Sequence, residues 1–279
     1  MLSLRPAPAI RRVGAALIVT LVVTGTLAYA QFRGYRRGSL PIATADSFDG
    51  AYQFCRAAFR GIQGGDGGGW LTDYPDVDRN LSIRLGELTK TPVSMNQRTG
   101  EPNHVIVQLT APELYHCPMI HMYEVGNFFI DETEAAALRD YLLKGGFLWV
   151  DDFWGERAWS IWESQIRKVF PSGTHPFVDL TVDHPLFHQF QTVSKIPQIP
   201  SIDFWLGTGG GTSERGPDSR TPHVRAILDE RDRIMVLITF NTDFGDSYER
   251  EGVNHDYFLT FSVPGYAFGI NTLIYAMTH

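Results

Sequence analysis

Short apolar runs alternate along this chain with segments whose apolar residues recur every three or four positions. The apolar runs predict β-strands over residues 52–59, 104–109, 118–123 and 147–150. The helical spacing occurs over residues 80–90, 156–170 and 265–279. Regular alternation of strands and helices predicts an α/β domain in which helices pack on a sheet.

The run over residues 147–150 is continuous, as in a strand whose two faces are both covered. A capping box over residues 131–134 predicts the start of the preceding helix, and Gly145-Gly146 predicts its end. That helix would carry one apolar face, made of Leu138, Tyr141 and Leu142. The helix after the strand would pack on the sheet through Trp159, Trp162, Ile166 and Val169.

The later part of the chain predicts insertions into this layered pattern. Residues 224–228 and 234–240 flank a polar reversal and predict a β-hairpin. Residues 207–221 are rich in glycine, serine and arginine, which predicts a mobile surface loop.

The first thirty residues have the pattern of an export signal. Three arginines precede an apolar run over residues 13–27, and Ala28-Tyr29-Ala30 offers small residues where a signal peptidase cleaves. We expect cleavage after Ala30, which leaves residues 31–51 as a lead-in and residues 52–279 as one α/β domain. The run is shorter than the roughly 20 residues that span a bilayer, but three more arginines follow it. An uncleaved membrane anchor is therefore the alternative.

The charge of the exported part excludes some partners. Loss of residues 1–30 removes three of the 24 basic residues and none of the 31 acidic ones, so the formal charge falls from −7 to −10. Such a surface repels nucleic acids and anionic membranes, so we expect no nucleic-acid partner and membrane contact only through an uncleaved N-terminal segment. A periplasmic or extracellular location would permit a bond between Cys55 and Cys117, but both are equally compatible with buried thiols.

Two acidic motifs carry the candidate chemistry. The first follows a glycine-dense loop over residues 61–69, and the second follows the predicted strand at 147–150, where open α/β sheets place their ligands. The candidate ligand-binding residues are Trp70, Asp73, Asp76, Asp78, Asp151, Asp152, Trp154 and Glu156. We expect the two motifs to form one acidic cleft at the carboxyl edge of the sheet, which then binds a cation or contains carboxyl groups with raised pKa values. Neutralisation by Arg79, Arg84 or Arg157 would instead indicate a structural ion-pair network.

Each acidic residue also has a purely structural interpretation. Asp78 or Asn80 is a candidate N-cap of the helix over residues 80–90. Asp73 is a candidate for fixing a turn through its own backbone. One of Asp151 and Asp152 is expected to cap the helix that follows.

Six motifs occur in a characteristic order: Trp70, Thr72-Asp73-Tyr74-Pro75, residues 78–80, Lys144-Gly145-Gly146-Phe147-Leu148, Asp151-Asp152-Phe153-Trp154-Gly155-Glu156 and Asp183-His184-Pro185. Over roughly residues 52–279 they resemble the bacterial family named domain of unknown function 4159. The resemblance implies no particular activity, but it implies export or attachment to a membrane. It also implies a fold similar to the class I glutamine amidotransferases, an amidotransferase- or flavodoxin-like three-layer sandwich around a mainly parallel sheet.

Thiol and hydroxyl nucleophiles find no support in this sequence. The amidotransferase resemblance would place a catalytic cysteine in a sharp turn after a central strand, but the turn after Val150 offers Asp151 and Asp152. Neither cysteine stands between glycines, and no Gly-x-Ser-x-Gly motif occurs. The catalytic residues are therefore unknown, and the prediction leans against an enzyme.

No motif predicts a cofactor or a metal centre. His184 and His188 have the spacing of zinc ligands on a helix, but Pro185 replaces the glutamate of the zincin motif and favours a short helix instead. The glycines at 207–211 lack the lysine that ends a phosphate-binding loop. The preferred function is a non-catalytic module that binds a small ligand or an envelope protein. The alternatives are a carboxylate- or metal-dependent hydrolase of an envelope sugar or peptide, and a structural subunit of a membrane-associated complex.

Overall fold

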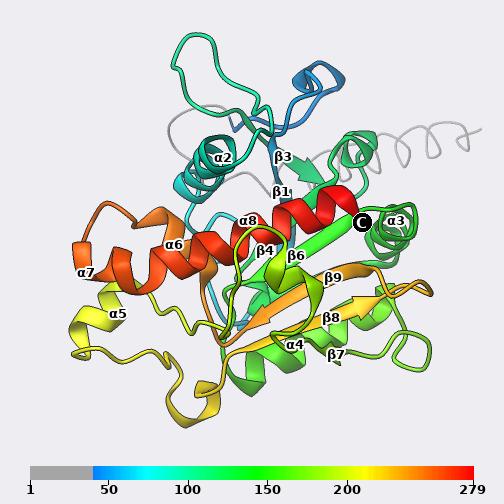
Figure 1. Ribbon diagram of the computed structural model, residues 1–279. Helices are drawn as coiled ribbons and strands as arrows, with labels where there is room; N and C mark the ends of the chain where they lie inside the picture. Colours follow the sequence, from blue (N-terminus) through cyan, green and yellow to red (C-terminus); the bar gives the residue numbers. More distant parts are fainter. Residues whose placement is uncertain (1–39) are drawn as a thin grey trace, which may run out of the picture. The chain divides into compact units, whose positions relative to one another are not determined.

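The computed structural model describes residues 40–279, and residues 41–279 form one compact unit. Its centre is a seven-stranded sheet in the order β3-β1-β4-β6-β9-β8-β7 (Figure 1). Neighbours from β3 to β9 run parallel, whereas β8 is antiparallel to β9 and β7 to β8. The strands are β1 (Phe54–Ala58), β3 (His104–Gln108), β4 (Met119–Tyr123), β6 (Phe147–Asp151), β7 (Val178–Asp179), β8 (His223–Leu228) and β9 (Ile234–Phe240). A separate two-stranded ladder joins β2 (Arg60–Gly61) to β5 (Phe128–Phe129).

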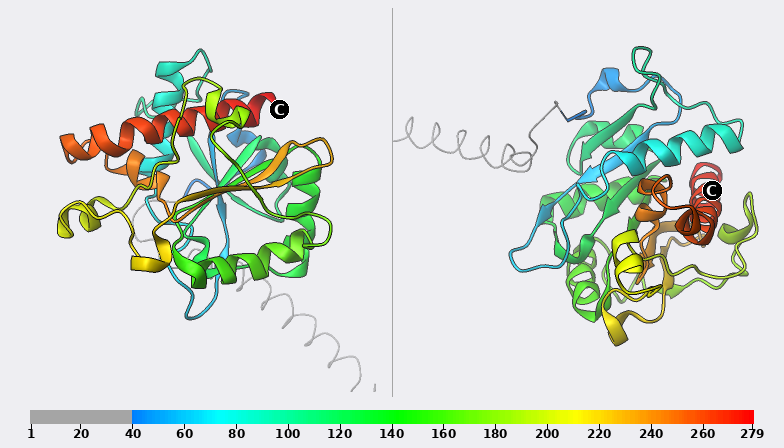
Figure 2. Two further views of the ribbon diagram at one scale, coloured as in Figure 1. Left: turned by 60° about the horizontal axis from the view of Figure 1, so that its bottom comes forward. Right: turned by 90° about the vertical axis from the view of Figure 1, so that its left-hand side faces the viewer.

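Helices cover both faces of the sheet (Figure 2). On one face α2 (Asp76–Leu88), α6 (Phe244–Glu249) and α8 (Val263–Thr278) contact one another. On the other face α3 (Glu132–Leu143) packs against α4 (Gly155–Val169). Shorter elements are α5 (Ile202–Gly207), α7 (His255–Tyr257), a π-helical turn (Phe258–Ser262) and 3-10 turns at Ala45–Ser47, Pro112–His116, Val125–Asn127, Pro185–His188 and Gly216–Ser219. The predicted α/β class with a mainly parallel central sheet is therefore confirmed.

The strand order reverses at β1. The chain passes from β1 through α2 to β3 on one side, and it later adds β4 and β6 on the other side. Parallel strands end at the same edge of a sheet, and ligands of open α/β sheets bind at that edge beside such a reversal. The loops after β1, β4, β6 and β9 all leave from this edge, which makes it the place to look for a site.

The continuous apolar runs became the buried strands β4, β6 and β9. Trp149 on β6 is fully buried between Phe244 and Phe268, and its Nε1 donates a hydrogen bond to Thr239 Oγ1 at 2.9 Å. On α4 the residues Trp162, Ile166 and Val169 are buried as predicted, while Trp159 is only partly buried. The period-3.6 pattern identified the packed face of this helix correctly.

Several helix boundaries confirm or correct the sequence predictions. Asp131 and Glu134 form the expected capping box of α3. The hairpin is present as β8 and β9. By contrast, α2 begins at Asp76, with Pro75 at the N-cap position and no side-chain cap. The prediction that Asp78 or Asn80 caps this helix is wrong.

The segment 207–221 is not an open loop throughout, because it contains the 3-10 turn Gly216–Ser219. Asp218 in this turn accepts a hydrogen bond from the backbone N–H of Glu156 at 3.0 Å. The segment therefore packs over the start of α4, and its mobility stays a prediction.

Cys55 and Cys117 form a disulfide that joins β1 to a residue two positions before β4, with 6.1 Å between their Cα atoms. Part of the predicted lead-in belongs to the compact unit, since the N–H of Ala43 donates to the carbonyl of Ile106 on β3. The proposed signal over residues 1–30 lies outside the described residues. Within residues 40–279, no helix combines the length and apolar character that a membrane span requires.

Candidate functional site

The first part of the site is the loop that connects β1 to α2. Arg56 on β1 donates from Nη1 to the backbone carbonyls of Trp70 and Thr72, both at 2.9 Å. Its Nε donates to Asp78 Oδ1 at 3.0 Å. One buried guanidinium thus fixes the part of the loop that leads into α2, and Asp73 lies within this part in the left-handed region with φ of 59°.

The second part is the end of β6. Asp151 is the last residue of the strand, and its carboxylate accepts hydrogen bonds from Thr239 Oγ1 at 2.5 Å and from the N–H of Gly245 at 3.0 Å. Asp152 follows with φ of 55°, so the chain turns at once. Its Oδ1 accepts a hydrogen bond from Trp154 Nε1 at 3.0 Å. Asp151 therefore faces the start of α6, while Asp152 faces Asp73.

The third part follows β9, and sequence reasoning missed it. Asp243 is the N-cap of α6 and accepts a hydrogen bond from the N–H of Asp246 at 2.8 Å. Asp246 and Glu249 lie on α6 itself, three residues apart and on one face. The available signal was weaker than at Asp151, because Asn241 and Thr242 separate the apolar strand from Asp243.

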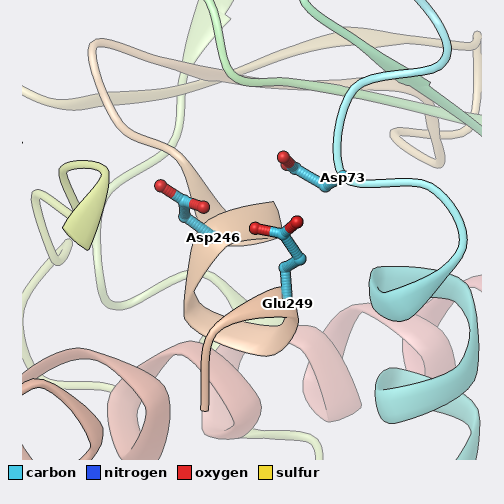
Figure 3. A group of neighbouring side chains, drawn as sticks. All are labelled: Asp73, Asp246 and Glu249. Atoms are coloured by element: carbon cyan, nitrogen blue, oxygen red, sulfur yellow. The ribbon is translucent and has the colours of Figure 1, made fainter. Parts of the chain in front are cut away.

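These three parts bring their carboxylates together in two groups that share Asp73. One group contains Asp73, Asp152 and Asp243, and the other contains Asp73, Asp246 and Glu249; within each group the candidate ligand oxygens lie within 4.8 Å of one another. Figure 3 shows the second group, with Asp73 directed towards α6. Asp152, Asp243 and Asp246 are only 7%, 4% and 5% exposed. We call the five residues of the two groups the acidic cluster: Asp73, Asp152, Asp243, Asp246 and Glu249.

The predicted meeting of the two motifs is therefore present for Asp73, which groups with Asp152 and is close enough to Asp151 for that charge to raise its pKa. Asp76 is exposed on α2, and Asp78 is fully buried against Arg56. Glu156 is exposed at the start of α4. Trp70 and Trp154 retain 6% and 4% of their exposure, too little for a sugar-stacking surface, because such a surface needs an open ring face.

Residues 59–277 match the family model described as domain of unknown function (DUF4159). The chain belongs to the DUF4159 family. No curated protein matches it. The family membership confirms the resemblance seen in the spaced motifs but brings no established activity with it.

The electrostatics of the DUF4159 acidic cluster are those of carboxyl groups crowded away from water. Burial, followed by the charge of Glu249, raises the pKa of Asp73 to about 7. Burial, and then the charges of Asp73 and Glu249, raises the pKa of Asp246 to about 9. Burial and neighbouring carboxylates also raise the pKa values of Asp152 and Asp243 well above the ordinary range. Beside the cluster, burial raises the pKa of Asp151 to about 7, although its hydrogen bonds oppose the shift.

The arginines that were candidates to neutralise the cluster bind elsewhere. Arg79 pairs with Asp76 and Glu101, and Arg84 pairs with Glu87 and Glu251. Arg157 donates to the carbonyl of Gly64. Among the ion pairs of residues 40–279, only that of Arg250 with Glu249, at 2.6 Å, involves a cluster member. The interpretation as a structural ion-pair network is therefore not supported.

The start of α4 corrects another prediction. Neither Asp151 nor Asp152 caps this helix, whose N-cap position is Trp154. Its first N–H groups donate instead to Asn241 Oδ1 at 2.9 Å and to Asp218 Oδ2 at 3.0 Å. Residues distant in sequence perform the capping, so both carboxylates after β6 are released from that role.

Glu124 closes the glycine-dense loop beside the cluster. Its Oε2 accepts hydrogen bonds from Gly69 N–H at 2.9 Å, from Thr72 Oγ1 at 2.7 Å and from the N–H of Gly68. A side chain at Gly68 would bring a Cβ to 2.9 Å from Glu124 Oε2, so glycine permits this close approach. Glu124 follows β4 and is thus a further acid at the same sheet edge.

The other candidate groups lie in structural roles. His184 accepts a hydrogen bond from the N–H of Leu186 and begins the 3-10 turn Pro185–His188, as predicted from Pro185. His188 Nε2 lies 2.7 Å from the carbonyl of Val182. Both cysteines are consumed by the disulfide. Among the candidate groups, the carboxylate oxygens of the acidic cluster are therefore the ones available to bind a ligand.

Proposed function

We propose that this DUF4159 protein binds a hard divalent cation through Asp73, Asp152 and Asp243 and uses it to hold a ligand at the carboxyl edge of its sheet. It would be a non-catalytic binding module. The observation that carries the proposal is the Oδ2 atom of Asp73, which is buried and has no hydrogen-bond partner. This proposal departs from the sequence prediction, which assigned no metal ligand.

The physical reason for cation binding is the unfavourable free energy of the carboxylates in an empty site. A buried carboxylate without a partner is unfavourable, and like charges at this separation oppose one another. A divalent cation removes both penalties at once. Both groups of ligands contain carboxylates only, a donor set that suits Mg²⁺, Mn²⁺ or Ca²⁺ better than zinc or copper.

The scaffold is proposed to be a degenerate amidotransferase-like fold. Parallel strands from β3 to β9 with helices on both faces support that likeness. The disulfide removes both thiols from any cysteine-based hydrolysis of glutamine, and it also supports an exported location, where oxidising conditions preserve such bonds. A small ligand or an envelope protein would then complete the coordination of the cation.

A cation-dependent hydrolase of an envelope sugar or peptide is a second candidate. Asp151, with a pKa raised to about 7, lies beside the cluster and has a protonation range suited to a general base. Its two hydrogen-bond donors, Thr239 and Gly245, favour a scaffolding role instead. Hydrolysis of envelope oligosaccharides or peptides that depends on added cation would favour this candidate.

Cation binding is tested by calorimetric titration of EDTA-treated protein with Mg²⁺, Mn²⁺ and Ca²⁺, together with thermal unfolding. We expect saturable binding and a cation-dependent rise in Tm, since a ligand at 100 times its Kd adds about 2.7 kcal/mol of stability. Asp152→Asn should weaken binding at least tenfold, whereas the exposed Glu156→Gln, from the same motif, should not.

The variant Asp151→Asn tests whether Asp151 supports the fold or binds the cation. Because Asp151 accepts hydrogen bonds from Thr239 and Gly245, this change should lower the Tm of the cation-free protein and leave the cation affinity largely unchanged. Native mass spectra without bound metal and a Tm indifferent to all three cations would overturn the proposal.

A further inference from the structure

We propose that the acidic cluster holds two divalent cations, bridged by the carboxylate of Asp73. The first would bind Asp73, Asp152 and Asp243, and the second would bind Asp73, Asp246 and Glu249. This inference rests on the proposed cation-binding function and specifies its stoichiometry and its bridging ligand.

Asp73 is the one residue that belongs to both groups. Its position explains this, because Asp73 lies close both to Asp152 after β6 and to Asp246 and Glu249 on α6. A carboxylate has two oxygens, and in two-metal sites the ions lie roughly 3.5–4 Å apart, a spacing that one carboxylate can bridge. Figure 3 shows the Asp73 carboxylate facing Asp246 and Glu249 from across the site.

The unpartnered oxygen of Asp73 also faces the α6 side of the cluster. Asp73 Oδ2 has no hydrogen-bond partner, and it lies against Gly245, the second residue of α6. A Cβ at Gly245 would lie 2.6 Å from this oxygen. The unpartnered atom is thus directed at the helix that carries Asp246 and Glu249.

Charge balance favours two cations over one. The five carboxylates carry five negative charges when ionised, and Arg250 supplies one positive charge through Glu249. A single divalent cation leaves two of the charges uncompensated in a site where three carboxylates are at least nine-tenths buried. Two divalent cations together with Arg250 balance all five.

The fold also separates the ligands from the residues that support them. Asp151 is occupied by Thr239 and Gly245, and Asp78 is occupied by Arg56. The five cluster members accept fewer protein hydrogen bonds: Trp154 donates to Asp152, the N–H of Asp246 donates to Asp243, and Arg250 donates to Glu249. Ligand oxygens therefore remain available on both sides of Asp73.

The test is Mn²⁺ titration of the chelator-treated protein, followed by calorimetry, native mass spectrometry and electron paramagnetic resonance. We expect two Mn²⁺ per chain and the exchange-coupled spectrum of a close Mn²⁺ pair. Glu249→Gln should reduce the stoichiometry to one and abolish the coupled signal, while the first Mn²⁺ binds within threefold of its original affinity. Glu251→Gln, which changes a neighbouring acid paired with Arg84, should leave two Mn²⁺ bound.

Asp73→Asn is the decisive variant because it removes the shared ligand. Both sites should weaken at least tenfold, more than the second site alone loses in Glu249→Gln. Circular dichroism of each variant verifies that the fold persists. One Mn²⁺ per chain with an uncoupled spectrum would overturn the pair and leave single-cation binding intact, whereas no bound Mn²⁺ would overturn both.

Discussion

Arg56 and Asp78 form an ion pair in which both side chains are fully buried, with Nε 3.0 Å from Oδ1. The same guanidinium lies 4.5 Å from the ring centroid of Tyr123 and binds two carbonyls of the loop that carries Asp73. Paired charges and saturated donors make such burial tolerable. The pair therefore anchors the site from beneath and leaves Asp73 without a direct cationic partner.

Asp78→Asn should destabilise the protein strongly. Removing one partner leaves the Arg56 charge buried and uncompensated, which typically costs about 3–5 kcal/mol. Urea denaturation monitored by circular dichroism measures this loss. Asp76→Asn, an exposed change two residues earlier, is the matched control and should stay within about 0.5 kcal/mol of the wild type. Equal stabilities for the two variants would contradict the anchoring role.

The site was partly predictable because its strongest signal is local. An apolar strand followed by Asp151-Asp152 identified the sheet edge, and the rule that parallel strands share an edge brought Asp73 to Asp152. Asp243 was harder to predict, because Asn241 and Thr242 separate it from the apolar strand. The pairing of Arg56 with Asp78 could not be predicted from the sequence. The two residues are 22 positions apart, and no local pattern indicates which acid pairs with a buried arginine.

The prediction of the residues that cap α4 was wrong for a related reason. Local preference assigned capping to the nearest acids, but Asn241 and Asp218 arrive from other parts of the chain and satisfy the same N–H groups. Tertiary contacts thus decide whether a carboxylate after a strand caps a helix or remains free for a ligand. The regular elements were predictable because their periodicity is local.

The stability of the cation-free protein should fall as pH rises. Asp73 and Asp151 have pKa values raised to about 7 and Asp246 to about 9, all above the ordinary value of 3.8. Between the ordinary and the raised values the folded state holds protons that the unfolded state has lost. These three groups therefore lower the free energy of unfolding as the pH rises from about 4 to about 9.

Thermal unfolding in EDTA at pH 5.5 and pH 9 measures this dependence. We expect a lower Tm at pH 9, by at least about 2–4 °C, the shift that about 1 kcal/mol produces in a domain of this size. Saturating Mg²⁺ or Mn²⁺ should reduce the difference, because a bound cation stabilises the ionised carboxylates. A Tm that rises with pH in EDTA would show that the cluster is not strained by its own charge.

Loss of the disulfide should lower stability without touching the acidic cluster. The bond closes a loop between residues 62 apart, and removal of such a bond costs about 2–4 kcal/mol. The Cys55→Ser, Cys117→Ser double variant should unfold at lower urea concentration, as should the reduced wild type, while Mn²⁺ affinity is retained. Neither protein should release ammonia from glutamine; such release by the wild type, abolished in the serine variant, would restore a thiol mechanism.

Gly245→Ala tests the geometry of the site with a single methyl group. Gly245 lies in α6, where alanine normally stabilises a helix by about 1 kcal/mol over glycine. Here the new Cβ would lie 2.6 Å from Asp73 Oδ2 and 3.2 Å from Asp243 Oδ1, so it would displace two proposed cation ligands.

We therefore expect Gly245→Ala to weaken Mn²⁺ binding at least tenfold and to lower, rather than raise, the cation-saturated Tm. Gly173→Ala is the matched control, since a Cβ there would meet no atom within 4 Å. It should leave Mn²⁺ affinity unchanged, which separates the local clash from a general effect of losing a glycine. Unchanged Mn²⁺ affinity in Gly245→Ala would mean that Asp73 and Asp243 do not contribute their oxygens as proposed. A methyl group so close to both oxygens must disturb any cation that is bound between them.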